Sequence, residues 1–276
     1  LTTVNAALQR TPTRDLIARS SFSAKPGQRI ATETILAFLA ENGFSRTGTV
    51  VDPGDYAVRG GLIDIYPPGV ASPVRLDFFG DTLEAIRTFD PETQRSTGQL
   101  KSLQLDPASE VLLTPDSIGR FRTGYAAAFG GIGHDDPLYE SVTGGRRYSG
   151  MEHWLPLFHE RLETLFDHVG PSVVSLDPSL DEAGAARQEQ IGEFFDARKT
   201  ALGQETFGAP PYKPLAPQVL YLKPEEWATS LGEHAVLALT PFEVPPATGQ
   251  KVIDAGGRQG RTFAAERSAD GGGSLY

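Results

Sequence analysis

The sequence predicts an α/β protein, a mostly antiparallel sheet with helices around it. Apolar residues recur at helical spacing over residues 32–42, and the period then changes to two over residues 49–113. Helical and strand patterns alternate again from residue 172 onward. The chain has 276 residues, enough for about two domains, and its 30 glycines and 21 prolines supply many turn signals.

The residues before the sheet are expected to form short helices. Thr13 is placed to cap a helix that has Asp15 in its first turn, and residues 25–27 (Lys-Pro-Gly) mark a break. Residues 32–42 predict an amphipathic helix that ends at Asn-Gly, residues 42–43. We expect this helix to cover one face of the sheet.

Apolar runs separated by turns predict the strands of the sheet. The Gly-Asp pair at residues 80–81 fits a two-residue hairpin whose first turn residue has a positive φ. The last of these runs is Val111 to Leu113. We interpret these runs and turns as an antiparallel sheet.

The second half predicts helices with short strands between them. Thr114-Pro115 and Asp136-Pro137 each combine an N-cap residue with proline at the first helical position. The remaining expected elements are a helix over residues 156–168, a buried strand over 172–176, a helix over 181–202, a strand over 219–222, a helix over 224–231 and a strand over 235–239. The residues from 245 onward are expected to be a linker.

Composition excludes several classes of protein. There is no cysteine, so disulfide scaffolds and thiolate sites are excluded, and this fits a cytoplasmic protein. The net charge of −10 disfavours broad non-specific binding to DNA. No apolar run is long enough to span a bilayer, and the first residues lack the basic-then-apolar order that is typical of a signal peptide. The first residue is not methionine, so we expect a segment of a longer protein.

No catalytic, cofactor or metal site is predicted in this segment. The P-loop pattern GxxxxGK[ST] does not occur, and no Ser/His/Asp set can be selected. His134, Asp135 and Asp136 could ligate a metal, but Asp136 is better explained as a helix cap. An enzyme is therefore not expected.

Arginines on the predicted strands are the more informative feature. Arg59, Arg75 and Arg87 stand near tyrosine and phenylalanine on strands separated by tight turns. Arginine beside an aromatic ring is typical of interface anchors. The alternative is that these arginines are strand residues in local ion pairs, and the pattern alone favours that alternative.

Several motifs together resemble a known family. The chain begins LTTVNAALQRTP and later contains NGFSR (42–46), GDYAVRGGLIDIYPPG (54–69), PVRLDFFGDTLEAIRTFDPETQR (73–95) and SGMEHW (149–154). These resemble the UvrB-homology module of the bacterial transcription-repair coupling factors, the Mfd family; UvrB has a similar but looser run. The likeness implies the tail of a degenerate RecA-like domain (1–28), a UvrB-like UvrA-interaction domain (29–113), the rest of the RecA-like domain (114–240) and a linker into the following domain (241–276).

The resemblance also implies a function and its residues. A module of this kind recruits UvrA of the nucleotide excision repair machinery to lesions marked by stalled RNA polymerase. The UvrA-binding residues would be Arg46, Arg59 and Tyr66, which we expect to form one contiguous exposed patch. Where UvrB carries a further arginine, this chain has Ala57, so the contact set is not fully kept. The alternative is a nucleotide-dependent, DNA-damage-binding ATPase module like UvrB.

The likeness also places functions elsewhere in the longer protein. ATP and Mg²⁺ would belong to later motor domains, and RNA polymerase and double-stranded DNA would bind domains beyond residue 276. In UvrB the strand that matches residues 172–177 ends in an acidic box. Here Asp177 is followed by Pro178, which can neither position water nor accept a proton. The motor fold implied for this segment would therefore lack ATPase chemistry.

Overall fold

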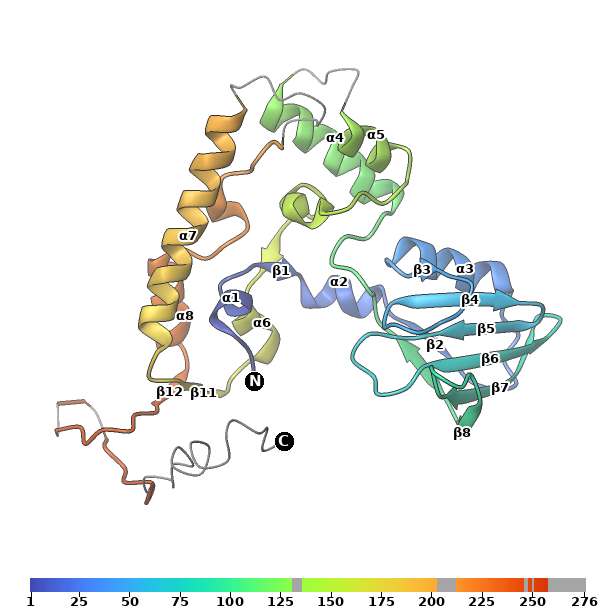
Figure 1. Cartoon of the computed structure of the whole chain (residues 1–276), viewed down its shortest axis with the longest axis horizontal. Helices are drawn as coiled ribbons and strands as arrows, with labels where there is room; N and C mark the ends of the chain where they lie inside the picture. The colour runs from blue at the N-terminus through green and yellow to red at the C-terminus, as the bar shows by residue number, and fades with distance from the viewer. Residues whose placement is uncertain (131–135, 203–211, 246–247, 250, 258–276) are drawn as a thin grey trace, which may run out of the picture.

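The chain forms two lobes, each with its own hydrophobic core (Figure 1). The computed structural model describes residues 1–130, 136–202, 212–245, 248–249 and 251–257. We call residues 22–108 the sheet lobe and residues 111–221 the helical lobe. The mixture of sheets and helices agrees with the predicted α/β class. Within the described residues, no helix combines the length and the apolar character that crossing a membrane requires.

The sheet lobe is built on six strands in the order β3-β4-β5-β6-β7-β8. These are β3 (Ser45–Arg46), β4 (Asp55–Arg59), β5 (Leu62–Ile65), β6 (Val74–Phe79), β7 (Thr82–Phe89) and β8 (Ser96–Leu100). Every neighbouring pair is antiparallel except β3 and β4. Gly80, in the hairpin between β6 and β7, has a φ of 58°, so the predicted hairpin is confirmed.

One face of this sheet is covered by α3 (Thr32–Glu41), as predicted (Figure 1). Ile35 and Leu39 of α3 are fully buried and pack with Ile63 and Leu76 of the strands. The strands β2 (Phe22–Ala24) and β9 (Leu103–Leu105) pair with each other and add Ala24, Leu103 and Leu105 to this core.

The chain begins with α1 (Val4–Ala7), β1 (Thr11–Pro12) and α2 (Arg14–Arg19). The side chain of Thr13 accepts a hydrogen bond of 3.2 Å from the backbone N–H of Leu16, which confirms the predicted cap. β1 pairs with β10 (Leu162–Glu163), so the start of the chain is attached to a segment some 150 residues later.

The helical lobe has an aromatic core. Its elements are α4 (Pro115–Phe129), α5 (Pro137–Thr143), the 3₁₀ helices η1 (Met151–Leu157) and η2 (Pro217–Val219), and α6 (Leu165–Val169). Thr114 and Asp136 cap α4 and α5, as predicted. Phe121 of α4 stacks on Phe158 with ring centroids 4.8 Å apart, and both rings are buried.

Three predicted elements are wrong. Residues 156–168 form no single helix, because the 3₁₀ turn η1, which contains Pro156, ends at Leu157 and the chain then extends into β10 before α6. Val111 to Leu113 form no strand, and Val111 and Leu113 are instead buried in the core of the helical lobe. Residues 219–222 contain the end of η2 and a single bridge from Tyr221 to Gln9.

The long helix α7 (Leu180–Ala201) and α8 (Pro224–Gly232) match the predictions (Figure 1). β11 (Val173–Leu176) and β12 (Ala235–Ala238) form a two-stranded parallel sheet. β11 was expected to be buried, but Val173 is 69% exposed and every residue of β12 is exposed. No described element covers these strands well enough to bury them.

Candidate functional site

The candidate site is the face of the six-stranded sheet opposite α3, which we call the open face. Alternation along the strands places Ile63 and Ile65 in the core under α3, and therefore places Asp64 and Tyr66 on the other side. The register continues this side across the sheet through Arg75 and Arg87 to Gln99. A row of polar and charged side chains thus crosses the open face.

A loop covers part of the open face. Val50, Ala57 and Phe89 form a small buried cluster, and the ring of Tyr66 packs against it. Ala57 is 2% exposed and Val50 is fully buried. A long charged side chain at position 57 would displace this loop, because Ala57 is part of this small core.

Arg59 holds the same loop in place. Its Nη2 donates to the carbonyl of Gly48 at 2.8 Å and to Oγ1 of Thr49 at 3.1 Å. On the other side of the loop, Nε2 of Gln94 donates to the carbonyl of Val50 at 3.0 Å. Arg59 remains exposed, and no carboxylate among the described residues forms an ion pair with it. Its positive charge is therefore available to a partner.

The other two strand arginines are in ion pairs. Arg75 donates to both carboxylate oxygens of Asp64, at 2.6 and 2.8 Å, and lies 4.7 Å from the ring centroid of Phe89. The hydrogen bond to Asp64 raises the pKa of Arg75 despite the opposing effect of burial. Nη1 of Arg87 lies 3.3 Å from Oδ2 of Asp77, so these two side chains form an ion pair. The local ion-pair interpretation thus holds for Arg75 and Arg87, and Arg59 is the exception.

The three residues implied by the family resemblance are accessible to different degrees. Arg46 and Arg59 are exposed, and Tyr66 is half-buried, with its hydroxyl 3.4 Å from the carbonyl of Ala71. Arg46 pairs in register with Tyr56, which belongs to the core under α3. The register therefore directs Arg46 away from the face that carries Arg59 and Tyr66.

The expected contiguous patch is therefore not formed on one face. Arg59 pairs with Leu62, four residues before Tyr66, so Arg59 and Tyr66 are about 13 Å apart along the strand at a rise of about 3.3 Å per residue. Of the three residues, the open face carries two. The exposed guanidinium of Arg59 lies at one end of the β4–β5 hairpin, and the ring of Tyr66 lies at the other end.

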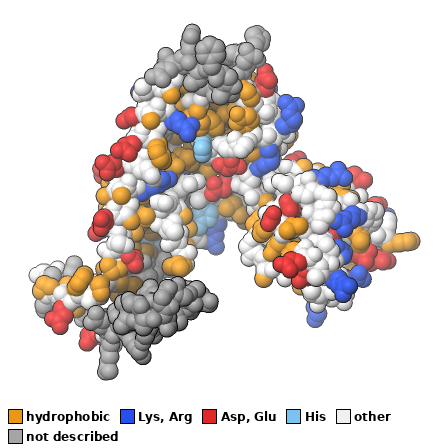
Figure 2. Space-filling view, viewed as in Figure 1, with side chains coloured by type: hydrophobic (Ala, Val, Ile, Leu, Met, Phe, Trp, Pro, Cys, Tyr) orange, Lys and Arg blue, Asp and Glu red, His pale blue; other side chains and the backbone are white. Residues whose placement is uncertain are grey.

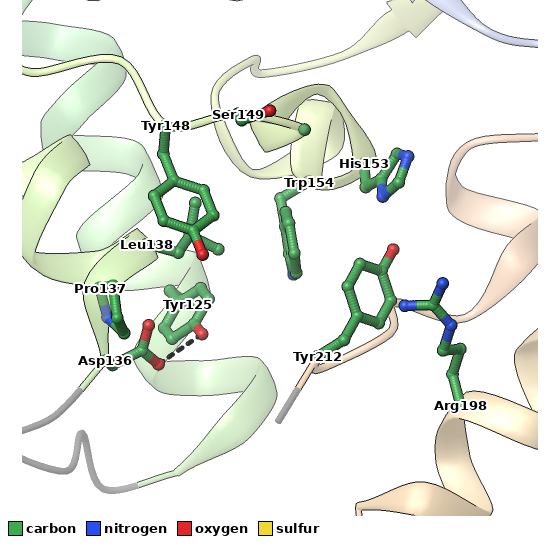
Figure 3. A pocket seen from close by; sticks show the side chains of 11 residues that line it. Tyr125, Asp136, Pro137, Leu138, Tyr148, Ser149, His153, Trp154, Arg198 and Tyr212 are labelled. Carbon is green, nitrogen blue, oxygen red and sulfur yellow. Dashed lines mark hydrogen bonds between the residues drawn. The ribbon is translucent and has the colours of Figure 1, made fainter. Parts of the chain in front are cut away.

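A second polar cluster lies in the helical lobe (Figure 3). The hydroxyl of Tyr125 donates to Oδ2 of Asp136 at 2.7 Å, and Nζ of Lys213 donates to the same oxygen at 2.8 Å. Burial alone would raise the pKa of Asp136, but these bonds and one from the backbone N–H of Tyr139 outweigh it and lower the pKa. Asp136 thus joins three segments of the lobe. Its neighbours in the metal hypothesis, His134 and Asp135, lie outside the described residues.

Sequence reasoning did not identify Lys213 as the partner of Asp136, since 77 residues separate them and no motif links them.

Asp177 has a local role. Its Oδ1 accepts hydrogen bonds from the backbone N–H and hydroxyl of Ser179, at 3.0 and 2.6 Å, in the turn that begins α7. These bonds lower the pKa of the Asp177 carboxyl. This turn accounts for the aspartate without a motor role.

Comparison with known proteins agrees with the sheet lobe. Residues 22–111 match the model of the UvrB interaction domain family. Transcription-repair-coupling factors are similar over most of the chain: that of Rickettsia bellii is 34% identical over 216 residues, which is 78% of this chain and 19% of the relative. That of Haemophilus influenzae is 30% identical over 90% of this chain, and that of Escherichia coli 30% over 88%; each match spans 21% of the relative. The chain spans about a fifth of the length of these relatives.

Proposed function

Because the chain belongs to the family of transcription-repair-coupling factors, we propose that its sheet lobe is the surface through which such a factor recruits UvrA. One observation carries this proposal. The residues that match the UvrB interaction domain, 22–111, coincide with a lobe that has its own core and leaves part of one sheet face exposed. A protein that shares this domain with UvrB can present UvrA with a surface of the same kind.

Arg59 is the central anchor of the proposed surface. It is exposed, it carries an unpaired positive charge among the described residues, and it orders the loop of residues 47–53 beside it. A guanidinium forms strong paired hydrogen bonds with carboxylates, so the matching group on UvrA is acidic. Arg46 adds a second charge at the neighbouring edge strand, and Tyr66 supplies a ring on the open face.

The test is the affinity of the intact chain for UvrA, measured by calorimetry. Arg59→Glu is expected to lower the affinity by at least about 30-fold, which corresponds to the roughly 2 kcal/mol of a strong anchor. Increasing salt is expected to weaken the wild-type complex, because exposed charges are screened over about 8 Å at physiological ionic strength.

Two control variants separate charge from loop position. Thr49→Ala removes one acceptor of Arg59 but leaves its charge, so it is expected to retain most of the affinity. Lys101→Glu makes the same change of charge at an exposed position just after β8. Unchanged affinity in Arg59→Glu, or an equal loss in Lys101→Glu, would contradict the assignment.

We further propose that residues 1–28 and 114–240 belong to one RecA-like domain, which the sheet lobe (29–113 in this division) interrupts. The exposed parallel pair β11–β12 supports this, because parallel sheets are normally buried on both faces. Further strands of the same sheet would then come from elsewhere in the longer protein. On this proposal the segment has no ATPase activity of its own and residues 241–276 lead into the next domain.

The other activities of the family are proposed for regions outside this chain. ATP and Mg²⁺ would bind the later motor domains, and RNA polymerase and double-stranded DNA would bind domains that this chain does not contain. The factor would act in the cytoplasm. Absence of nucleotide binding by this segment in a titration with labelled ATP is the expected result, and binding would favour the UvrB-like ATPase alternative.

A further inference from the structure

A groove runs along α7 on the side that faces the rest of the helical lobe. It consists of two adjoining cavities of about 380 and 210 Å³, which share His153, Arg198 and Tyr212 in their walls. Trp154 and Tyr148 stand at the smaller cavity, across from Tyr212 (Figure 3). The larger cavity lies between α7 and residues 214–221.

The wall formed by α7 is a single stripe of side chains. Arg187, Ile191, Phe194, Phe195 and Arg198 stand at positions i, i+4, i+7, i+8 and i+11, so they share about 100° of the helix surface. Phe194 is 59% exposed although it lies on this side. The stripe is therefore apolar in its middle, with one arginine toward each end, and it is only partly covered.

Both arginines have a charge that the described residues do not neutralise. The Arg187 guanidinium lies 5.8 Å from the ring centroid of Tyr221, and that of Arg198 lies 4.5 Å from that of Tyr212. Neither forms an ion pair within the described ranges. Nε of Arg187 is buried with no hydrogen-bond partner, although Nη1 donates to Gln190 at 2.6 Å.

The walls of the groove carry little negative charge, although the chain as a whole is acidic. The carboxylate that borders it, Asp136, is already held by Lys213. The acidic residues of α7, at 181, 182, 189, 193 and 196, do not line either cavity. Lys or Arg and His side chains are visible among hydrophobic ones on this side of α7 (Figure 2). A ligand that fits has apolar groups in the middle and negative charge toward its ends.

The spacing of the arginines defines that ligand further. Eleven residues of α-helix separate the two Cα atoms by about 16 Å. An extended peptide covers the same distance in about five residues. We propose that this groove binds an extended peptide segment of a partner protein, with two acidic residues about five positions apart and an aliphatic or aromatic residue between them. Phe194 and Phe195, in the middle of the stripe, provide the apolar surface against which such a residue packs.

The experiment is a selection from a phage-displayed library of unstructured 12-residue peptides on the intact chain. Selected peptides are expected to share two acidic residues four to six positions apart around an apolar one. Their affinity, measured by fluorescence anisotropy, is expected to fall at least tenfold with Arg187→Glu or Arg198→Glu. Arg187→Gln, which removes the charge without reversing it, is expected to give a smaller loss.

Lys101→Glu is the matched control, because it makes the same change of charge at an exposed position of the sheet lobe that lines neither cavity. It is expected to leave the affinity within about twofold, and circular dichroism confirms that each variant folds. The proposal is overturned if no acidic consensus is enriched, or if the peptides bind all variants equally. It is also overturned if the wild-type chain dimerises in sedimentation and Arg198→Glu abolishes the dimer, since the occupant would then be a second copy. UvrA binding is measured separately through Arg59, so each proposal can fail alone.

Discussion

The sheet lobe and the helical lobe form their buried cores from different types of residue. The sheet lobe buries aliphatic side chains at alternate positions of its strands, beneath Ile35 and Leu39 of α3. The helical lobe buries aromatic rings that come from helices, 3₁₀ turns and loops. A core made by regular alternation can be recognised in a sequence, whereas a core made by irregular segments cannot.

Each lobe also buries one carboxylate beside a cation, and the pairs differ in their separation along the chain. Asp64 and Arg75 are 11 residues apart on adjacent strands, whereas Asp136 and Lys213 are 77 residues apart. The first pair stabilises a local register between β5 and β6. The second joins segments that are distant in sequence, so the helical lobe depends more on long-range contacts.

The largest expected effect tests whether the two cores are independent. Phe121 is fully buried and contacts Phe158 and Tyr125, so Phe121→Ala is expected to destabilise the helical lobe by about 3–5 kcal/mol. Hydrogen exchange resolves the effect by lobe. Slowly exchanging amides of α4 are expected to lose protection, while those of β6 and β7 keep it.

Leu76→Ala provides the reciprocal variant. Leu76 lies fully buried on β6 within the other core, and its loss is expected to cost about 2–5 kcal/mol. It is expected to lower protection in β6 and β7 and to spare α4. Equal loss of protection in both lobes from either variant would mean that the chain unfolds as one unit.

A somewhat smaller effect is expected from the ion pair of the sheet lobe. Asp64→Ala leaves the guanidinium of Arg75 without its partner at a position where the side chain is 15% exposed, and this is expected to cost about 3 kcal/mol. Denaturant unfolding measures the change. The double variant Asp64→Leu with Arg75→Met is expected to recover most of that loss, because no charge is then left unpaired. A double variant as unstable as the single one would show that packing, and not the unpaired charge, is the cause.

Much of the sheet lobe could be predicted from local signals. The helix over residues 32–42, the Gly80 hairpin and the covered face all follow from periodicity and turn residues. Local signals could not decide whether the strand arginines are interface anchors or members of local ion pairs. Only the register reveals that Arg75 has a buried partner while Arg59 faces a loop carbonyl.

The helical lobe was predicted well at its capped helices and poorly between them. Thr114 and Asp136 are local caps that do not depend on the rest of the fold. The pairing of β10 with β1 and the exposure of β11 depend on contacts across the chain, which no window of sequence contains. The groove along α7 was missed for a similar reason. The stripe is visible on the helix, but the opposite wall comes from residues 214–221.

The smallest expected effect concerns the junction of the lobes. Nε2 of His159, in the helical lobe, lies 2.9 Å from the carbonyl of Glu110, which precedes Val111 at the lobe boundary. Burial lowers the pKa of His159, and the nearby charge of Arg120 adds to this, although the hydrogen bond to Glu110 opposes it. The imidazole is therefore neutral in the folded protein at neutral pH.

A histidine that is harder to protonate when folded adds stability above its unfolded pKa of about 6.5, and this stability is lost as pH falls toward the folded pKa. Glu110 has the opposite influence, because burial and the nearby Glu152 raise its pKa, so its protonation on acidification favours the folded state. The difference between wild type and His159→Gln isolates the histidine. The free energy of unfolding of the wild type is expected to fall more steeply than that of the variant from about pH 6.5 downward, as measured by urea unfolding. Parallel pH profiles would show that His159 titrates alike in the folded and unfolded chains, and that its burial at the lobe junction does not disfavour protonation.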